Sequence, residues 1–132
     1  MADGKTVRVV DSALDCPPLP FVVGGGNARA VLWPGRGALY RTIQIIELHG
    51  GDRTIEFSHP NDSVYYVKAG EGSVIDVKEG VSLPLVEGSM IHTDAGDTYR
   101  FEADGADGLT LIGGPCPADE RLYASLENDK GN

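Results

Sequence analysis

Basic residues, long apolar runs and cysteines are all scarce in this sequence. Eleven Lys and Arg stand against 20 Asp and Glu, which leaves a net charge of -9. A chain with this charge lacks the electrostatic footprint for nucleic acid backbones or anionic lipid surfaces. The apolar runs are short, and the first ten residues carry no basic segment that leads into a hydrophobic core. We therefore expect a cytoplasmic protein with neither nucleic acid nor membrane among its partners.

The two cysteines form no redox or metal motif. Cys16 and Cys116 lie a hundred positions apart, and each precedes a proline. Neither spacing fits a CxxC redox site or a zinc knuckle, and without an export signal two reduced thiols are expected. A disulfide that ties the two ends together is the alternative.

Glycine, proline and β-branched residues are abundant. The chain has 18 Gly and 8 Pro, and Val, Ile and Thr together supply 25 of its 132 residues. This mixture suits short strands joined by tight turns, and the length suits one core. We expect a single all-β domain over residues 1–132.

Segments of strand-like character recur along the chain, each bounded by Gly, Asp, Asn or Pro. The expected strands are residues 6–10, 28–32, 40–48, 53–59, 64–68, 73–78, 89–93, 98–103 and 109–113. This spacing is typical of a sandwich or a barrel. Residues 118–126 (ADERLYASL) contain good helix formers and predict one short helix.

Strand alternation selects side chains that point into the barrel. Ile55, Phe57 and His59 share one face, and Tyr99 and Phe101 share another that is free of charge. An imidazole and a phenol in an apolar interior are typical of a small-molecule site. The alternative is an ordinary core role in which hydrogen bonds satisfy both groups.

Three more side chains are candidates for the same cavity. His92 points into the cavity if the strand at 89–93 turns the face that carries His92 inward. Arg41 and Gln44 lie three apart in one expected strand, so only one of them points inward. An inward Arg41 would select a carboxylate or phosphate, and an inward Gln44 a neutral polar substrate.

The stretch GDRTIEFSHPNDSVYYVKAG resembles the first signature of the cupins. In that signature a Gly is followed after five residues by HxH, after three or four more by Glu, and after six more by Gly. Here five residues separate Gly51 from Phe57, three separate His59 from Ser63, and six separate Ser63 from Gly70. The spacing of the signature is kept.

The stretch GSMIHTDAGDTYRFEA is similar to the second cupin signature, in which Gly, PxG, His and Asn recur at fixed spacing. Gly88, Gly96 and Tyr99 fall on the frame, with Asp94 at the Pro position and Ala103 at the Asn position. The glycines mark turns that a small antiparallel barrel requires.

The resemblance covers roughly residues 40–115. It implies a small RmlC-like cupin, whose antiparallel β-barrel is a jelly-roll-like double-stranded β-helix. We place the barrel core at about residues 28–115, an edge strand at 6–10 and the short helix at 118–126.

The departures from the family pattern fall on its metal site. Cupins bind metal through the two His of HxH, the Glu and the second-signature His, and those positions carry Phe57, His59, Ser63 and Tyr99 here. Because a catalytic metal needs about three good ligands, the resemblance implies a degenerate site and no cofactor. A divalent transition metal held by His59, His92 and Tyr99 is the alternative.

The remaining groups resemble those of metal-independent sugar epimerases in the cupin superfamily, which use a His and a Tyr. His59 is then the base, and Tyr99 delivers a proton or polarises the substrate oxygen. The expected substrate contacts are Phe57, Ser63, Tyr65, His92 and Phe101, with Arg41 or Gln44. We expect an isomerase, epimerase or lyase that acts on a small polar carbonyl or sugar-like compound. A metal-dependent oxygenase with a rearranged site and a non-catalytic binding cupin are the alternatives.

Small cupins commonly dimerise through edge strands. The segment expected at residues 6–10 precedes a proline-rich stretch and is a natural candidate to pair with a neighbouring subunit. We therefore expect a homodimer.

Overall fold

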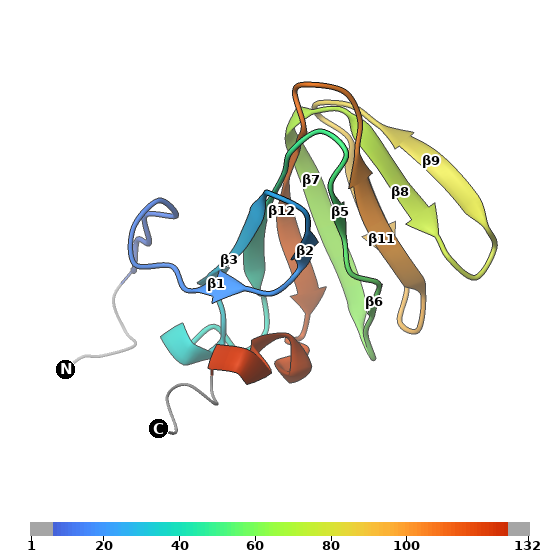
Figure 1. Ribbon diagram of the computed structural model, residues 1–132. Coiled ribbons are helices and arrows are strands. Elements are labelled where there is room, and N and C mark those ends of the chain that lie inside the picture. Colours follow the sequence, from blue (N-terminus) through green and yellow to red (C-terminus); the bar gives the residue numbers. More distant parts are fainter. Residues whose placement is uncertain (1–6, 127–132) are drawn as a thin grey trace.

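Two antiparallel β-sheets packed face to face make up most of the structure, a computed structural model that describes residues 7–126 (Figure 1). Side chains from both sheets meet in one buried core. Within the described residues, no helix is long and apolar enough to cross a membrane. The all-β architecture predicted from the sequence is confirmed.

The first sheet has six strands in the order β1-β3-β4-β12-β7-β10. Their bounds are β1 Pro18–Leu19, β3 Asn27–Leu32, β4 Ile43–Leu48, β12 Leu109–Cys116, β7 Asp62–Gly70 and β10 Met90–Thr93. The second sheet runs β2-β5-β11-β8-β9, and β6 also pairs with β11. Its strands are β2 Val22–Val23, β5 Arg53–Thr54, β11 Thr98–Ala103, β8 Gly72–Asp76, β9 Val81–Leu85 and β6 Phe57–Ser58. The two signature segments pair with each other in both sheets, since β7 pairs with β10 in the first and β6 with β11 in the second.

One expected strand, over residues 53–59, is two short strands, β5 and β6. Thr54 and Phe57 both point inward, with 1% and 2% of their surface exposed, so the alternation restarts between them. The hydroxyl of Thr54 accepts a hydrogen bond from the Phe101 amide at 2.9 Å, which ties this break to β11. The inward direction predicted for Ile55 is therefore wrong, and this residue is 39% exposed.

Aromatic rings fill the centre of the barrel. Tyr65, Tyr99 and Phe101 contact one another edge to face at centroid distances of 4.9–5.9 Å, and Phe57 packs on Tyr99 at 5.4 Å. All four side chains are almost wholly buried. The open apolar cavity expected there is therefore occupied by the protein's own side chains.

A short helix closes one end of the barrel. The segment expected at residues 118–126 begins with the 3-10 helix η2, Glu120–Tyr123, and residues 124–126 continue it. Tyr123 is fully buried and packs on Trp33 at 5.4 Å. Trp33 precedes the 3-10 helix η1, Pro34–Arg36, and the two helices lie together at this end (Figure 1).

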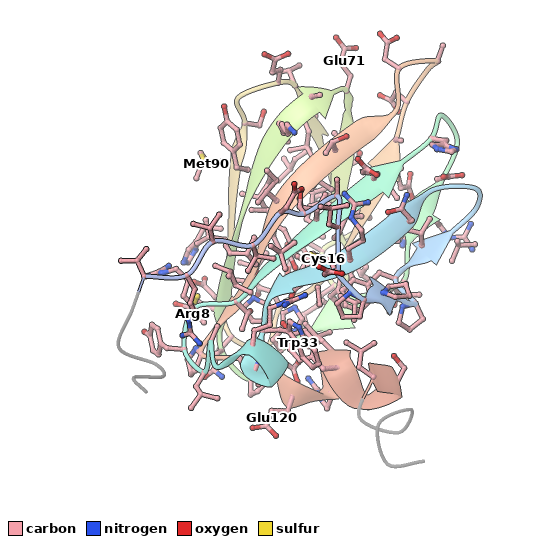
Figure 2. All side chains as sticks on the ribbon, turned by 90° about the vertical axis from the view of Figure 1, so that its left-hand side faces the viewer. Arg8, Cys16, Trp33, Glu71, Met90 and Glu120 are labelled. Atoms are coloured by element: carbon pink, nitrogen blue, oxygen red, sulfur yellow. The ribbon has the colours of Figure 1, made fainter. Side chains whose placement is uncertain are left out.

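The predicted edge strand at residues 6–10 is not formed. Residues 7–10 are irregular, because β1 occupies the sheet edge beside β3, and Thr6 lies outside the described residues. Figure 2 shows the segment that contains Arg8 in front of the first sheet. Val7 and Val9 are 94% and 92% exposed, so the described part of the chain leaves both uncovered.

The homodimer stays a prediction, with these two valines as its contact points. Light scattering at micromolar concentration should give twice the mass of one chain, because a second copy would cover them. Deletion of residues 1–12 should halve that mass and leave the circular dichroism spectrum unchanged. A monomer in the intact protein, or a dimer that survives the deletion, would contradict the prediction.

Both cysteines are free thiols in the structure. Cys16 precedes β1, and Cys116 is the last residue of β12. The disulfide considered as an alternative is not formed.

Candidate functional site

His59 lies just beyond β6, where a turn between β10 and β11 holds its backbone. The amide of Gly96 donates a hydrogen bond to the His59 carbonyl at 2.8 Å. Gly96 has a φ of +87°, a conformation that glycine adopts without strain. The imidazole points between the sheets and is 4% exposed. The inward direction predicted for His59 is confirmed.

Tyr99 projects from β11 opposite Phe57, its partner in the sheet register. Its phenolic oxygen lies 2.7 Å from Nε2 of His59, and the residue is 2% exposed. The ring of Phe57 packs against both groups. His59 and Tyr99 therefore meet in the interior, as strand alternation predicts, and Phe57 forms one wall beside them.

Three further hydroxyl groups from the first sheet gather around the Tyr99 oxygen. Tyr65 and Ser63, both on β7, lie 2.9 Å and 3.2 Å from it. Thr93 on β10 hydrogen-bonds to Ser63 in turn. We call Ser63, Tyr65, Thr93 and Tyr99 the hydroxyl cluster, and all four are buried. The Tyr99 oxygen thus has three hydrogen-bond partners.

Asp119 extends this network on the other side of His59. Its Oδ2 lies 2.8 Å from Nδ1 of His59, and the residue is 4% exposed. Arg121 donates from Nε to Oδ1 at 2.9 Å and from Nη2 to Oδ2 at 2.7 Å. Asp119 is the N-cap of η2, a role that an Asp before a helical segment signals. Nothing in the sequence signals its contact with a histidine 60 residues away.

The charges of this pair follow from burial and hydrogen bonding. Burial lowers the pKa of His59 below its ordinary value of 6.5, although Asp119 opposes the shift. Burial would raise the pKa of Asp119, but hydrogen bonds from Arg121 and His59 outweigh it and hold this pKa at about 2. At neutral pH the aspartate is therefore ionised and the imidazole is neutral.

These charges assign the direction of the hydrogen bonds. An ionised Asp119 only accepts, so Nδ1 of His59 carries the proton and donates. Nε2 is then the unprotonated nitrogen and accepts from the Tyr99 hydroxyl. Tyr65 and Ser63 are left to donate to the Tyr99 oxygen. The arrangement is an ordered chain from carboxylate to imidazole to phenol.

The two tyrosines are protonated at rest. Burial raises the pKa of Tyr99 to about 12, and it raises the pKa of Tyr65 well above the ordinary value of 10. Hydrogen bonds from Ser63 and Tyr65 act in the opposite direction on Tyr99, because they stabilise its phenolate. Tyr99 therefore holds its proton until His59 accepts it.

Two separate cavities reach the ends of this chain. One, of about 230 Å³, is lined by Phe57, His59, Asp119 and Arg121 among others. The second, of about 90 Å³, lies among β8, β9, β10 and β11 and reaches Tyr99. A ligand would therefore meet the network at its ends rather than in the middle of the barrel.

Five predicted substrate contacts line neither cavity. Two of them, Ser63 and Tyr65, lie behind the Tyr99 oxygen, to which both hydrogen-bond. The other three are Phe101, Gln44 and Arg41. Phe101 is fully buried behind Tyr99. Gln44 points inward, but its amide oxygen accepts from the Tyr123 hydroxyl at 2.6 Å, so it serves the core. Arg41 points outward and is exposed. Of Arg41 and Gln44, only one of which was expected to point inward, Gln44 is the inward residue.

His92 does not point into the barrel interior, contrary to the prediction. Its neighbours Ile91 and Thr93 are the inward residues of β10, with 8% and 6% exposed. The His92 side chain is 58% exposed on the outer face, 3.7 Å from Asp62 and 3.6 Å from Asp94. The residue is therefore no partner for His59, although it borders the cavity of about 90 Å³ that reaches Tyr99.

The residues at the four ligand positions of the cupin pattern do not fit a transition metal. Phe57 has no donor atom, and both ring nitrogens of His59 are engaged, by Asp119 and Tyr99. A stable site needs about three nitrogen, sulfur or carboxylate ligands. With His92 on the outer face, the alternative set of His59, His92 and Tyr99 does not converge either.

Metal analysis should reflect this donor set. Protein purified without chelators should hold well under one equivalent of any transition metal per chain. A chelator should leave the free energy of unfolding unchanged, because no ligand set links metal to folding. Stoichiometric metal that the His59→Ala variant loses would contradict this prediction.

Acid should destabilise the fold in two steps. Because folding lowers the pKa of His59 below 6.5, the unfolded chain gains a proton first as the pH falls, and stability is lost below about pH 6.5. Asp119, with a pKa of about 2 when folded and 3.8 ordinarily, adds a second loss as the pH falls from 3.8 to 2. Urea unfolding across this range measures both steps. The His59→Gln variant should lose the first step, and an unchanged profile would contradict the assignment.

Comparison with known proteins finds likeness in structure. No protein-family model and no curated protein matches the sequence. A predicted oxalate decarboxylase from Thermotoga maritima is 21% identical, with 80% of this chain and 96% of that chain covered and a TM-score of 0.66. The polyketide cyclase RemF from Streptomyces resistomycificus is 17% identical, with 92% and 94% covered and a TM-score of 0.67. An RmlC-like cupin from Shewanella frigidimarina is 17% identical, with 87% and 96% covered and a TM-score of 0.66.

These likenesses define the class of structure. The chain has the cupin fold, a double-stranded β-helix of two antiparallel sheets. Because one fold hosts many chemistries, the activity depends on the side chains of the site and not on the fold alone.

Proposed function

We propose that this protein is a metal-independent enzyme that moves a proton beside the carbonyl group of a small substrate. Tyr99 meets the substrate, His59 accepts the phenolic proton, and Asp119 positions His59. Isomerisation, epimerisation and elimination are the reactions that such a set of groups performs without a cofactor.

The proton follows hydrogen bonds that are already in place. The Tyr99 oxygen takes a proton from the carbon beside the carbonyl while its own proton passes to Nε2 of His59. The substrate becomes an enolate, and the imidazolium of His59 is stabilised by the Asp119 carboxylate 2.8 Å away. Return of the proton to the same or a neighbouring carbon gives the epimer or the isomer. Loss of a leaving group from the enolate gives the elimination product.

One observation carries the proposal. Asp119, His59 and Tyr99 form a single buried chain with distances of 2.8 Å and 2.7 Å, and its phenol end borders a cavity. Buried groups with shifted pKa values and a matched partner beside a cavity are typical of acid–base sites. The hydroxyls of Tyr65 and Ser63 add two donors that stabilise a transient phenolate.

A second candidate is a cupin that binds a small ligand without turnover. The completeness of the network favours it, because the Tyr99 oxygen already has three partners from the protein itself. In that case the same groups stabilise the core and shape the cavity.

Exchange of carbon-bound protons for deuterium separates the two candidates. We would incubate the protein in D₂O with keto acids, sugar acids, lactones and uncharged ketones, and follow loss of the proton beside the carbonyl by NMR. An enzyme of the proposed kind accelerates exchange in at least one compound, and the Tyr99→Phe variant does not. Saturable binding of a compound from the panel with no accelerated exchange in any of them would favour the binding protein and contradict the proposal.

A further inference from the structure

The two sheets separate along one side of the barrel, at β9 and β10. Within residues 7–126, β9 ends the second sheet and β10 ends the first, so these two edges face each other unpaired. Figure 1 shows β9 at the outer edge of its sheet. We call the opening between them the edge slot. Its apolar lining residues are Val74, Leu83, Pro84, Leu85, Met90 and Ile91.

Leu83 shows that the edge slot is open to solvent. It pairs with Val74 in the register of β8 and β9, so both side chains project toward the first sheet. Val74 is only 7% exposed, but Leu83 is 51% exposed. A leucine on the inner face of a sheet is ordinarily buried, and its exposure beside other apolar groups marks a binding surface.

The edge slot leads to the tyrosine of the hydrogen-bond chain. Its outer part has a volume of about 390 Å³, within the range of roughly 300–1,000 Å³ usual for small-molecule sites. Its inner part is the cavity of about 90 Å³ at Tyr99 and Thr93. Val74, Leu83, Ile91 and His92 line both parts, so the two parts are adjacent and share these walls. The inner part borders two members of the hydroxyl cluster, Tyr99 and Thr93.

The charge of the edge slot restricts what it binds. Its acidic side chains are Asp76 and Asp97, and His92 lies at its rim, whereas none of its lining residues is Lys or Arg. An anionic ligand would meet two carboxylates with no Lys or Arg to compensate, in a chain of net charge -9. The slot therefore disfavours carboxylates and phosphates.

We propose that the edge slot binds the apolar body of an uncharged ligand, whose polar end lies at Tyr99 and Thr93. The identity of that polar end as a ketone carbonyl rests on the proposed function, but the binding of the apolar body does not. The substrate class is then an uncharged ketone with an aromatic or aliphatic body, rather than a sugar acid or a phosphorylated sugar.

Two fluorescent naphthalenes test this class directly. The first is 6-propionyl-2-(dimethylamino)naphthalene, an uncharged aryl ketone, and the second is 1-anilinonaphthalene-8-sulfonate, an anion. The ketone should bind saturably and at least about tenfold more tightly than the sulfonate, a difference of about 1.4 kcal/mol. Amide NMR shifts on binding should be largest in β9 and β10. Equal affinities, or shifts confined to other strands, would overturn the proposal.

A matched pair of variants places the ligand in the slot. Leu83→Asp adds a carboxylate inside the slot, and Ser82→Asp adds the same charge on the opposite face of β9. The first should weaken the ketone at least about tenfold and the second less than about twofold. Leu83→Lys should instead strengthen binding of the sulfonate. Because Leu83 is half exposed, these changes leave the core intact. Equal ketone affinity in the two aspartate variants would overturn the proposal.

The His59→Gln variant separates this proposal from the proposed function. Residue 59 does not line the slot, so the variant should bind the ketone probe as tightly as the unaltered protein does. It should lose proton exchange. Slot binding in a protein that exchanges no proton would support the slot and contradict the enzyme. The opposite result is proton exchange that is lost in His59→Gln, together with probe affinity and exchange that Leu83→Asp leaves unchanged. That result would support the proposed enzyme and overturn the proposed ligand site in the slot.

Discussion

Tyr99→Phe should reduce turnover by roughly 10²–10⁴ while the protein still folds and still binds its ligand. The variant removes only the oxygen that exchanges a proton with the substrate, and the ring keeps its contacts with Phe57 and Phe101. His59→Gln should reduce turnover to a similar extent, because an amide cannot take the phenolic proton. The rate of deuterium exchange beside the carbonyl measures both variants.

Controls for this prediction are available in the same chain. Tyr66→Phe removes a hydroxyl from the outer face of β7, where Tyr66 is 43% exposed, and should leave the rate unchanged. The double variant Tyr99→Phe with His59→Gln should be little slower than either single one, because the two groups act as a unit. Full activity in Tyr99→Phe, or rate losses that multiply in the double variant, would contradict the proton relay.

Asp119→Asn should also reduce turnover by roughly 10²–10⁴, although Asp119 touches no substrate. An asparagine can present an N–H group to Nδ1 of His59, which moves the imidazole proton to Nε2. A protonated Nε2 cannot accept the proton of Tyr99, so the relay is blocked by the wrong tautomer. The loss should appear in kcat rather than in KM, since the slot is untouched.

The matched control is Asp94→Asn, which alters an exposed carboxylate 3.6 Å from His92. It should change neither kcat nor stability. Asp119→Asn itself should lower the free energy of unfolding by about 1–3 kcal/mol, because buried hydrogen bonds lose their charged acceptor. Lowered stability with an unchanged kcat would show that Asp119 serves the fold alone.

Alternation along a strand predicts much of the site. A charged residue lies between Tyr99 and Phe101 on β11, so alternation predicts that both aromatic side chains point inward. Both are buried in the structure. Ser63 and Tyr65 on β7 follow the same period and reach the Tyr99 oxygen. These strands are long and regular, so a period of two suffices to place their side chains.

Two errors show where alternation fails. His92 shares a face with Met90, as predicted, but that face is the outer one, because β10 buries Ile91 and Thr93 instead. A period of two relates neighbours to each other and does not say which face meets the core. Ile55 was misplaced for another reason, since β5 and β6 are separate strands and the period restarts between them.

Asp119 could not be placed from the sequence at all. The expected helix at residues 118–126 includes Asp119, whereas the structure makes this residue the N-cap of η2. Its contact with His59 depends on where η2 docks against the end of the barrel, and Tyr123 sets that position by packing on Trp33. Such a contact joins segments far apart in the chain, so local patterns do not reveal it. The filled barrel centre is likewise a result of packing among several rings.

The proton relay depends most directly on the state of the His59 imidazole. Nitrogen NMR of protein labelled in its three histidines, assigned with the His59→Gln variant, measures that state without a substrate. We expect a neutral ring at pH 7 with the proton on Nδ1, an unprotonated Nε2, and a pKa of His59 below 6.5. A ring that is charged at pH 7, or one that carries its proton on Nε2, would contradict this expectation.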